Sequence, residues 1–284
     1  MAKRRDNLER TSAPPSDSPV AAAQLNNTED LFSFVTPTEF VDLPSEGKFY
    51  AEGHPLHGVE SVEIRHMTAK EEDILTSETL LRKGIAIDRL LHSVMVDKNI
   101  EVDNLLVGDK NALLVATRIT GFGPDYMVTL GCPSCTTTNE TEIDLGEIVM
   151  SVADDVEGAQ VTSTGTYTVT LPTTGVTVEL KLLTSGDERS LMQNIEKRKK
   201  LQLPENNATT LLGALIVSAN GVTDRAMINK LVNLLPLTDS KIARRTYNSI
   251  KPDMDMTFPF TCQNCDHTMR MEVPLTAEFF WPKQ

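Results

Sequence analysis

Two short stretches decide the fold: Gly131-Cys132-Pro133-Ser134-Cys135 and Thr261-Cys262-Gln263-Asn264-Cys265. Both are C-x-x-C knuckles, and together they contain all 4 cysteines of the chain. A two-residue gap lets successive thiolates turn toward one metal ion, so two knuckles can complete a tetrahedral zinc site. We therefore predict that Cys132, Cys135, Cys262 and Cys265 bind one structural Zn²⁺, because four protein ligands leave no position open for substrate or water.

The segments around the knuckles have the layout of a zinc ribbon, in which each knuckle joins two strands. Extended-looking segments precede the knuckles at 126–130 and 256–260 and follow them at 140–145 and 269–273. Two disulfides or two independent redox pairs are the alternatives, because compact ribbons leave only about 15–20 residues between knuckles. Disulfides need an oxidising compartment, and a thioredoxin-like pair would open a helix where Pro133 favours a turn. His267 is a further candidate ligand, although the four cysteines suffice.

Composition is that of an ordinary soluble protein, with 284 residues, 40% hydrophobic and 24% charged. The formal net charge of −13 opposes general binding to nucleic acid or to an anionic membrane. No apolar run approaches the roughly 20 residues that span a bilayer, and the polar N-terminus does not look like a signal peptide. We therefore expect synthesis in the cytoplasm, no membrane and no nucleic acid as a partner.

Changes in composition divide the chain into four segments. They are a flexible basic, Pro/Ser-rich arm at 1–30, an α+β core with the first knuckle at 31–158, a β-hairpin with a helical insertion at 159–250, and the second knuckle with an aromatic tail at 251–284. The predicted fold class is therefore α+β, with a zinc ribbon built from two distant parts of the chain.

Local signals place the elements of the first segment. A strand is expected around 59–64, and Thr68 with Glu71 forms a capping box that starts a helix. Gly84 interrupts this helical region, and helical spacing resumes over 87–95. Asp109 is the expected N-cap of a third helix, which ends at Gly121 and Gly123.

Alternation and turn residues place the elements between the knuckles. Residues 166–183 predict a β-hairpin, and a helix opens at Ser185 and reaches the basic run Lys197–Lys200. This run is expected to be a solvated helix end, since basic residues there complement the helix dipole. Further helices are predicted over 209–219, over 224–235, and from Asp239 or Ser240 to Ile250.

Both ends of the chain carry candidate partner contacts. Phe279, Phe280 and Trp281 form an aromatic cluster, and aromatic side chains often carry much of the binding energy at interfaces. Lys3, Arg4 and Arg5 form a basic arm on an otherwise acidic protein. The alternatives are an aromatic tail that packs on its own core and an arm that stays solvated. We expect at least one end to contact another protein.

No catalytic signature stands out, so we do not expect an enzyme or a small-molecule substrate. The sequence contains no G-x-S-x-G, no Walker loop, no dinucleotide-binding fingerprint and no H-E-x-x-H. His54 and His57 lie in a loop containing Gly and Pro, where an exposed histidine is the simpler interpretation.

Several blocks, in a fixed order, carry a resemblance to a known family. They are Leu43-Pro44-Ser45-Glu46-Gly47-Lys48-Phe49-Tyr50, residues 67–75, residues 84–91, Gly108-Asp109, the first knuckle, residues 182–188, Asp255-Met256-Thr257 and the ending Phe279-Phe280-Trp281-Pro282. From about residue 40 onward the chain resembles the T-even-type phage baseplate hub family. The resemblance implies a non-catalytic structural protein of a contractile-tailed bacteriophage, located in the tail baseplate of the virion and bound to other baseplate or tail proteins.

Two other functions stay open at this point. Some hub-region proteins of such phages act only during assembly, so an assembly chaperone absent from the mature virion is one alternative. A nucleic-acid-binding zinc-ribbon protein is the other, and it would need a basic, aromatic-studded ribbon surface.

Overall fold

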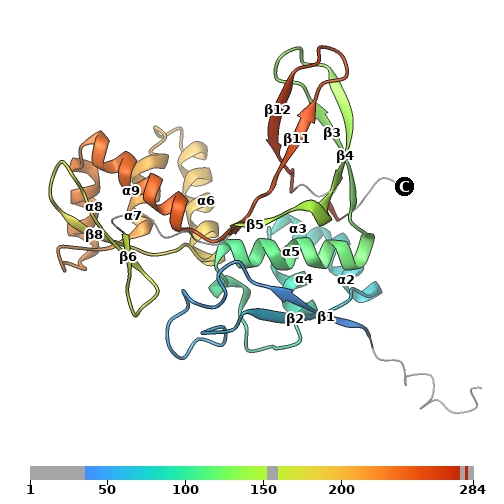
Figure 1. The fold of residues 1–284 in the computed structure, drawn as a ribbon, viewed down its shortest axis with the longest axis horizontal. Coiled ribbons are helices and arrows are strands. Elements are labelled where there is room, and N and C mark those ends of the chain that lie inside the picture. Colours follow the sequence, from blue (N-terminus) through green and yellow to red (C-terminus); the bar gives the residue numbers. More distant parts are fainter. Residues whose placement is uncertain (1–35, 152–158, 276–278, 281–284) are drawn as a thin grey trace, which may run out of the picture. The chain divides into compact units, whose positions relative to one another are not determined.

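The computed structural model describes residues 36–151, 159–275 and 279–280. All of these residues except Thr36 belong to one compact unit, Pro37–Gln284. Within these residues the fold is mixed α+β, with helices and several small antiparallel sheets (Figure 1). The predicted fold class is confirmed to that extent. The 1–30 arm lies outside the described residues.

The first sheet pairs two short strands, and the loop that joins them is buried in part. Strand β1 (Thr38–Asp42) pairs antiparallel with β2 (Ser61–Arg65), which confirms the strand expected around 59–64. In the loop between them, Gly47 has a φ of 70°, and a Cβ there would lie 2.3 Å from the backbone nitrogen of Val59. Only glycine fits this close approach.

Helices follow this sheet. They are α2 (Ala69–Thr76), α3 (Glu78–Arg82), α4 (Ala86–Val94), the short 3₁₀ helix η1 (Val102–Asn104) and α5 (Val107–Phe122). The capping box between Thr68 and Glu71 is present, and the break at Gly84 separates α3 from α4. Both features confirm the local signals in the sequence.

The expected role of Asp109 is wrong. Helix α5 begins at Val107 with Leu106 at the N-cap, because the backbone N–H of Val107 donates to the Leu183 carbonyl at 3.1 Å and fixes the entry. The Asp109 carboxylate lies fully buried in the first turn and accepts from the Ser45 hydroxyl and the Tyr50 hydroxyl, each at 2.6 Å. It binds the β1–β2 loop instead of capping the helix.

The segment between the knuckles contains a four-stranded antiparallel sheet in the order β6-β7-β8-β9. Its strands are β6 (Ala159–Val161), β7 (Tyr167–Thr170), β8 (Thr177–Leu180) and β9 (Ile216–Ala219). Strands β7 and β8 form the predicted hairpin. The helix predicted over 209–219 is too long, since its last residues form β9, where Ala219 pairs with Val178. Tertiary pairing with β8 outweighs local helix propensity there.

Helices cover the rest of this segment. They are α6 (Ser185–Lys200), α7 (Asn207–Leu215), α8 (Arg225–Leu234) and α9 (Leu237–Ile250). Helix α8 confirms the helix expected over 224–235, and Asp224 caps it, since its side chain accepts from Met227 N–H. Helix α9 begins at Leu237, before the expected start, because the Asp239 carboxylate accepts from the backbone N–H groups of Thr173 and Thr174.

The chain enters and leaves the segment that contains β6–β9 and α6–α9 at one place. Strand β5 (Met150–Ser151) pairs antiparallel with β10 (Asp253–Met254), and β10 lies against helix α5. Gly108 of α5 makes this approach possible, because a Cβ there would lie 2.2 Å from the Pro252 carbonyl oxygen. The two knuckles are therefore brought together although a long segment separates them.

Two hairpins then carry the knuckles. Strand β3 (Asp125–Gly131) pairs with β4 (Thr138–Asp144), followed by the 3₁₀ helix η2 (Leu145–Glu147), and β11 (Thr257–Thr261) pairs with β12 (Thr268–Glu272). Figure 1 shows the hairpins side by side with their tips together. The four predicted ribbon strands are confirmed.

Candidate metal centre

Each knuckle is a tight turn at the tip of its hairpin, and the two turns have the same backbone pattern. The N–H of Cys132 donates to the Thr137 carbonyl, and the N–H of Cys262 donates to the His267 carbonyl, both at 2.9 Å. The residue four positions after the first cysteine has a positive φ in each turn: 61° at Thr136 and 53° at Asp266. Two segments that are far apart in the sequence thus form matching halves of one site.

The two tips bring all four sulfur atoms together. Their Sγ atoms lie within 4.8 Å of one another, with 3.8 Å between Cys132 and Cys265 and 3.6 Å between Cys135 and Cys262. Tetrahedral zinc with Zn–S bonds of about 2.3 Å would separate its sulfurs by about 3.8 Å. A disulfide needs about 2.05 Å, and all four cysteines are unbridged. The spacing therefore fits one metal ion better than two disulfides.

Electrostatics at the cluster favours a cation. Hydrogen bonds from Thr137 lower the pKa of Cys135 to about 5, and the backbone N–H of Asn264 lowers the pKa of Cys262. A hydrogen bond from His267 lowers the pKa of Cys265, but the nearby Cys135 and burial outweigh it and raise the pKa to about 12. Four thiolates repel one another at this separation, and a divalent cation relieves that repulsion.

Two asparagines that the sequence analysis did not single out support the site. Asn139 is buried, and its Oδ1 accepts from the Gln263 N–H of the other hairpin at 2.8 Å, while its Nδ2 donates to the Thr137 carbonyl and faces Cys262 Sγ at 3.7 Å. Asn264 Nδ2 lies 3.7 Å from Cys135 Sγ. Such outer hydrogen bonds orient metal ligands. Only closeness to the knuckles marks these residues in the sequence.

The site offers four sulfur ligands. Four cysteine donors are the usual ligand set of a structural zinc, and a metal ion held by all four would join the two hairpins. Among the residues that the structure describes, no other cluster of His, Cys, Asp or Glu has a comparable geometry. His267 contributes backbone contacts to Cys262 and is not needed as a ligand.

Two of the three residues of the predicted aromatic contact cluster are buried in the chain itself, in agreement with the alternative of a tail that packs on its own core. Phe279 and Phe280 are only 1% and 2% exposed, and their rings meet edge to face with centroids 5.1 Å apart. Phe279 also packs against Tyr126, and its carbonyl accepts from buried Arg118 Nε at 2.5 Å. Burial in the chain's own core stabilises these rings better than exposure, so they serve the fold. Trp281, Lys3, Arg4 and Arg5 lie outside the described residues.

No described helix has the length and apolar character that would carry it across a bilayer. Neither the curated proteins nor the solved structures contain a match to this chain. A family model does match: the family described as T4 bacteriophage base plate protein covers residues 36–281, from the first described strand through both knuckles to the buried aromatic pair. The chain belongs to this family of T4-type phage base plate proteins.

Proposed function

We propose that this protein is a structural, non-catalytic component of the baseplate of a contractile-tailed phage, located at the hub or next to it. Family membership over residues 36–281 is the observation that carries the baseplate role. It also favours a location in the virion tail and contacts with other tail proteins. The hub position rests on the order of the sequence blocks that resemble hub proteins.

The metal in this proposal is zinc, with a structural role. Thiolate ligands are soft, and a tetrahedral set of four sulfurs is typical of zinc or of iron–sulfur sites. Sulfur separations of 3.6 and 3.8 Å agree with a mononuclear zinc site. The ion would join the β3–β4 hairpin to the β11–β12 hairpin and so fix both ends of the intervening segment.

Metal analysis of the purified chain tests this role directly. We expect about one zinc and no iron per chain after purification without added metal. Cys262→Ser should lose the ion and destabilise the two hairpins, because binding free energy at a structural site is folding free energy. His267→Ala is the matched control and should keep its zinc. Zinc-free wild-type protein, or equal zinc loss in both variants, would contradict the proposal.

Mass spectrometry of purified particles separates a virion component from an assembly chaperone. A component of the baseplate should be present at a copy number similar to that of other baseplate proteins. A chaperone would be present in infected cells but absent from finished particles. Absence from particles would therefore replace the structural role with the chaperone role, without bearing on the metal.

The surface of the ribbon argues against nucleic-acid binding. Glu140, Glu142 and Asp144 are exposed on β4, close to the first knuckle, where a nucleic-acid reader needs cations. A salt-sensitive gel shift with DNA or RNA would revive that function.

A further inference from the structure

We infer that Asn139 is the positioning residue of the metal centre: it holds the second knuckle against the first independently of the ion, and so sets the affinity of the site for zinc. The inference rests on the proposed function for the identity of the ion, but not for the contact between the hairpins. The sulfur cluster depends on that contact, because each hairpin contributes two of the four cysteines.

Backbone pairing does not align the two knuckles. Within the described residues, no backbone–backbone hydrogen bond connects β3 or β4 to β11 or β12. The two sides of the long segment pair as strands at β5 and β10, at the ends of the hairpins opposite the knuckles. Side chains at the tips therefore have to align the knuckles with each other.

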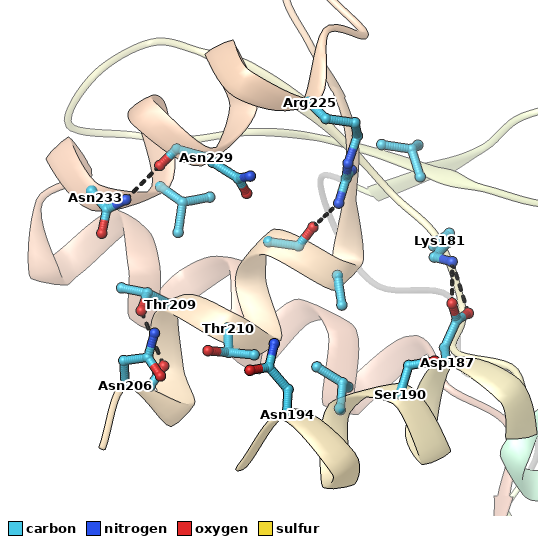
Figure 2. Close-up of a pocket in the computed structure, with 15 residues that line it drawn as sticks. Lys181, Asp187, Ser190, Asn194, Asn206, Thr209, Thr210, Arg225, Asn229 and Asn233 are labelled. Atoms are coloured by element: carbon cyan, nitrogen blue, oxygen red, sulfur yellow. Dashed lines mark hydrogen bonds and ion pairs between the residues drawn. The ribbon is translucent and has the colours of Figure 1, made fainter. Parts of the chain in front are cut away.

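The segment between the knuckles is held by contacts of its own. Its elements α6, α7 and α8 surround a cavity of about 810 Å³, and Figure 2 shows the polar contacts there. Lys181 Nζ contacts the Asp187 carboxylate, and the Arg225 guanidinium donates to the Gly213 carbonyl of α7. All of these partners lie within the segment, so these contacts do not position the cysteines.

Asn139 of β4 bonds to both knuckle turns at once. Its side chain belongs to a residue that is only 2% exposed. Its Oδ1 accepts at 2.8 Å from the N–H of Gln263, the residue that directly follows Cys262. Its Nδ2 donates at 2.9 Å to the Thr137 carbonyl, which also accepts from the Cys132 N–H in the first knuckle turn. One buried carboxamide thus joins the two tips.

The partners of this carboxamide fix its orientation. A rotation by about 180° would set its N–H groups against the Gln263 N–H and its oxygen against the Thr137 carbonyl. In the observed orientation Nδ2 also faces Cys262 Sγ at 3.7 Å, and Cys262 is fully buried. A ligand that is already held in place costs less to order when the metal binds, which raises affinity.

A second asparagine at the site shows what burial and bridging add. Asn264 Nδ2 lies 3.7 Å from Cys135 Sγ, the same distance as between Asn139 and Cys262, but Asn264 is exposed. Water can replace a lost contact at an exposed position, whereas a buried donor or acceptor without its partner stays unsatisfied. We therefore expect the zinc affinity to depend much more on Asn139 than on Asn264.

Zinc affinity of the full chain, measured by competition with a chelator, tests this order. Asn139→Ala should bind zinc about tenfold more weakly or worse, as is usual when a residue that orients a metal ligand is removed. Asn264→Ala should lose less affinity, and Asn248→Ala, which changes an exposed asparagine of α9, should lose none. Equal losses for Asn139→Ala and Asn264→Ala, or unchanged affinity in Asn139→Ala, would overturn the inference.

The variant Asn139→Asp separates the two halves of the contact. It keeps the Oδ1 acceptor for the Gln263 N–H and loses the donors to Thr137 and Cys262. It should keep the knuckles together but bind zinc more weakly, because a carboxylate beside Cys262 adds to the repulsion among the thiolates. Zinc binding as tight as in the wild type would contradict a role for the amide donors.

Amide hydrogen exchange at Gln263 gives a readout that needs no metal. In the wild-type chain, stripped of metal under reducing conditions, this N–H should exchange slowly, because Asn139 accepts from it. Asn139→Asp should keep the slow exchange and Asn139→Ala should lose it. Fast exchange in the metal-free wild type overturns the inference without any variant. Slow exchange in a chain that binds no zinc would show instead that the contact exists and that the proposed metal role is wrong.

Discussion

At the scale of single residues, carboxylates near helix starts have two different functions in this chain. Glu71 completes the capping box with Thr68 and also accepts from Arg65 and Ser93. Asp109 and Asp239 accept from loops 64 and 66 residues away in sequence. The first kind stabilises its own helix, whereas the second ties a helix to a distant part of the fold.

The ion pair of buried Glu71 with half-buried Arg65 yields a pH-dependent prediction. Burial raises the pKa of Glu71, but hydrogen bonds from Arg65, Ser93 and Thr68 outweigh it and hold the pKa well below its usual range. The stabilisation is therefore complete above the unfolded pKa of about 4.3 and is lost as the pH falls toward the folded value. Glu71→Gln should lower the free energy of unfolding at pH 7 by about 2 kcal/mol.

Urea unfolding of both proteins at pH 7 and at pH 3–4 measures this effect, and the difference should shrink at the lower pH. Glu78→Gln is the matched control, because its partner Arg82 and Glu78 itself are 81% and 82% exposed. That variant should change stability by about 0.5 kcal/mol or less. A difference for Glu71→Gln that is independent of pH would contradict the assignment.

At the scale of elements, a close crossing between α5 and β10 places the second hairpin beside the first. Gly108 lets the returning chain touch the first turn of α5, and Asn111 Nδ2 donates to Asp253 at 3.1 Å beside it. The Lys110 Nζ group reaches across to the Ser185 hydroxyl of α6 at 2.8 Å. One turn of α5 thus contacts both the start of α6 and the returning strand β10.

Gly108→Ala tests this crossing. Its Cβ would lie 2.2 Å from the Pro252 carbonyl oxygen and 2.8 Å from the Asp253 Cα, so backbone must move. We expect a loss of about 3 kcal/mol in the free energy of unfolding, measured by urea denaturation. Gly131→Ala, with no atom within 4 Å of the added Cβ, should be nearly neutral. Equal effects of the two changes would show that the crossing tolerates the extra atom.

At the scale of the whole described unit, residues from both sides of the long segment share one core. Tyr126 of β3 packs edge to face on Phe279 with centroids 5.2 Å apart, and its hydroxyl donates to the Pro274 carbonyl at 2.9 Å. Fully buried Arg118 of α5 donates to the carbonyls of Phe279, Gly123 and Asp125. Phe279 and Phe280 are therefore part of the protein's own core, packed beside residues of α5 and β3.

Phe279→Ala should consequently destabilise the isolated chain, by about 3–5 kcal/mol, because it removes a fully buried ring. Thermal or urea unfolding of the purified protein, with no other phage protein present, measures this. Phe40→Ala is the control, since that ring is 70% exposed on β1 and its loss should have little effect. If the Phe279 variant were as stable as the wild type, the ring would not be needed for the fold, and the predicted partner contact would be favoured instead.

The parts of the fold predictable from sequence were those set by local pattern. The strands and turns around Cys132 and Cys262, the capping box at Thr68 and the break at Gly84 all follow from short-range signals. Strand β9, the helix entry at Val107 and the burial of Phe279 depend on pairing and packing with distant residues. The site divides in the same way: the cysteines were found by spacing, whereas Asn139 acts across two hairpins and leaves no local pattern.

The separation of the knuckles has a consequence for how the protein is made. Cys135 and Cys262 are 127 positions apart, so a nascent chain presents the first pair of thiols while the sheet β6–β9 and helices α6–α9 have still to be synthesised. Until the second pair emerges from the ribosome, only half of the sulfur cluster exists. With zinc bound as proposed, metal capture is a late step of biogenesis, and a bound ion marks a chain whose long middle segment has already been completed and folded back.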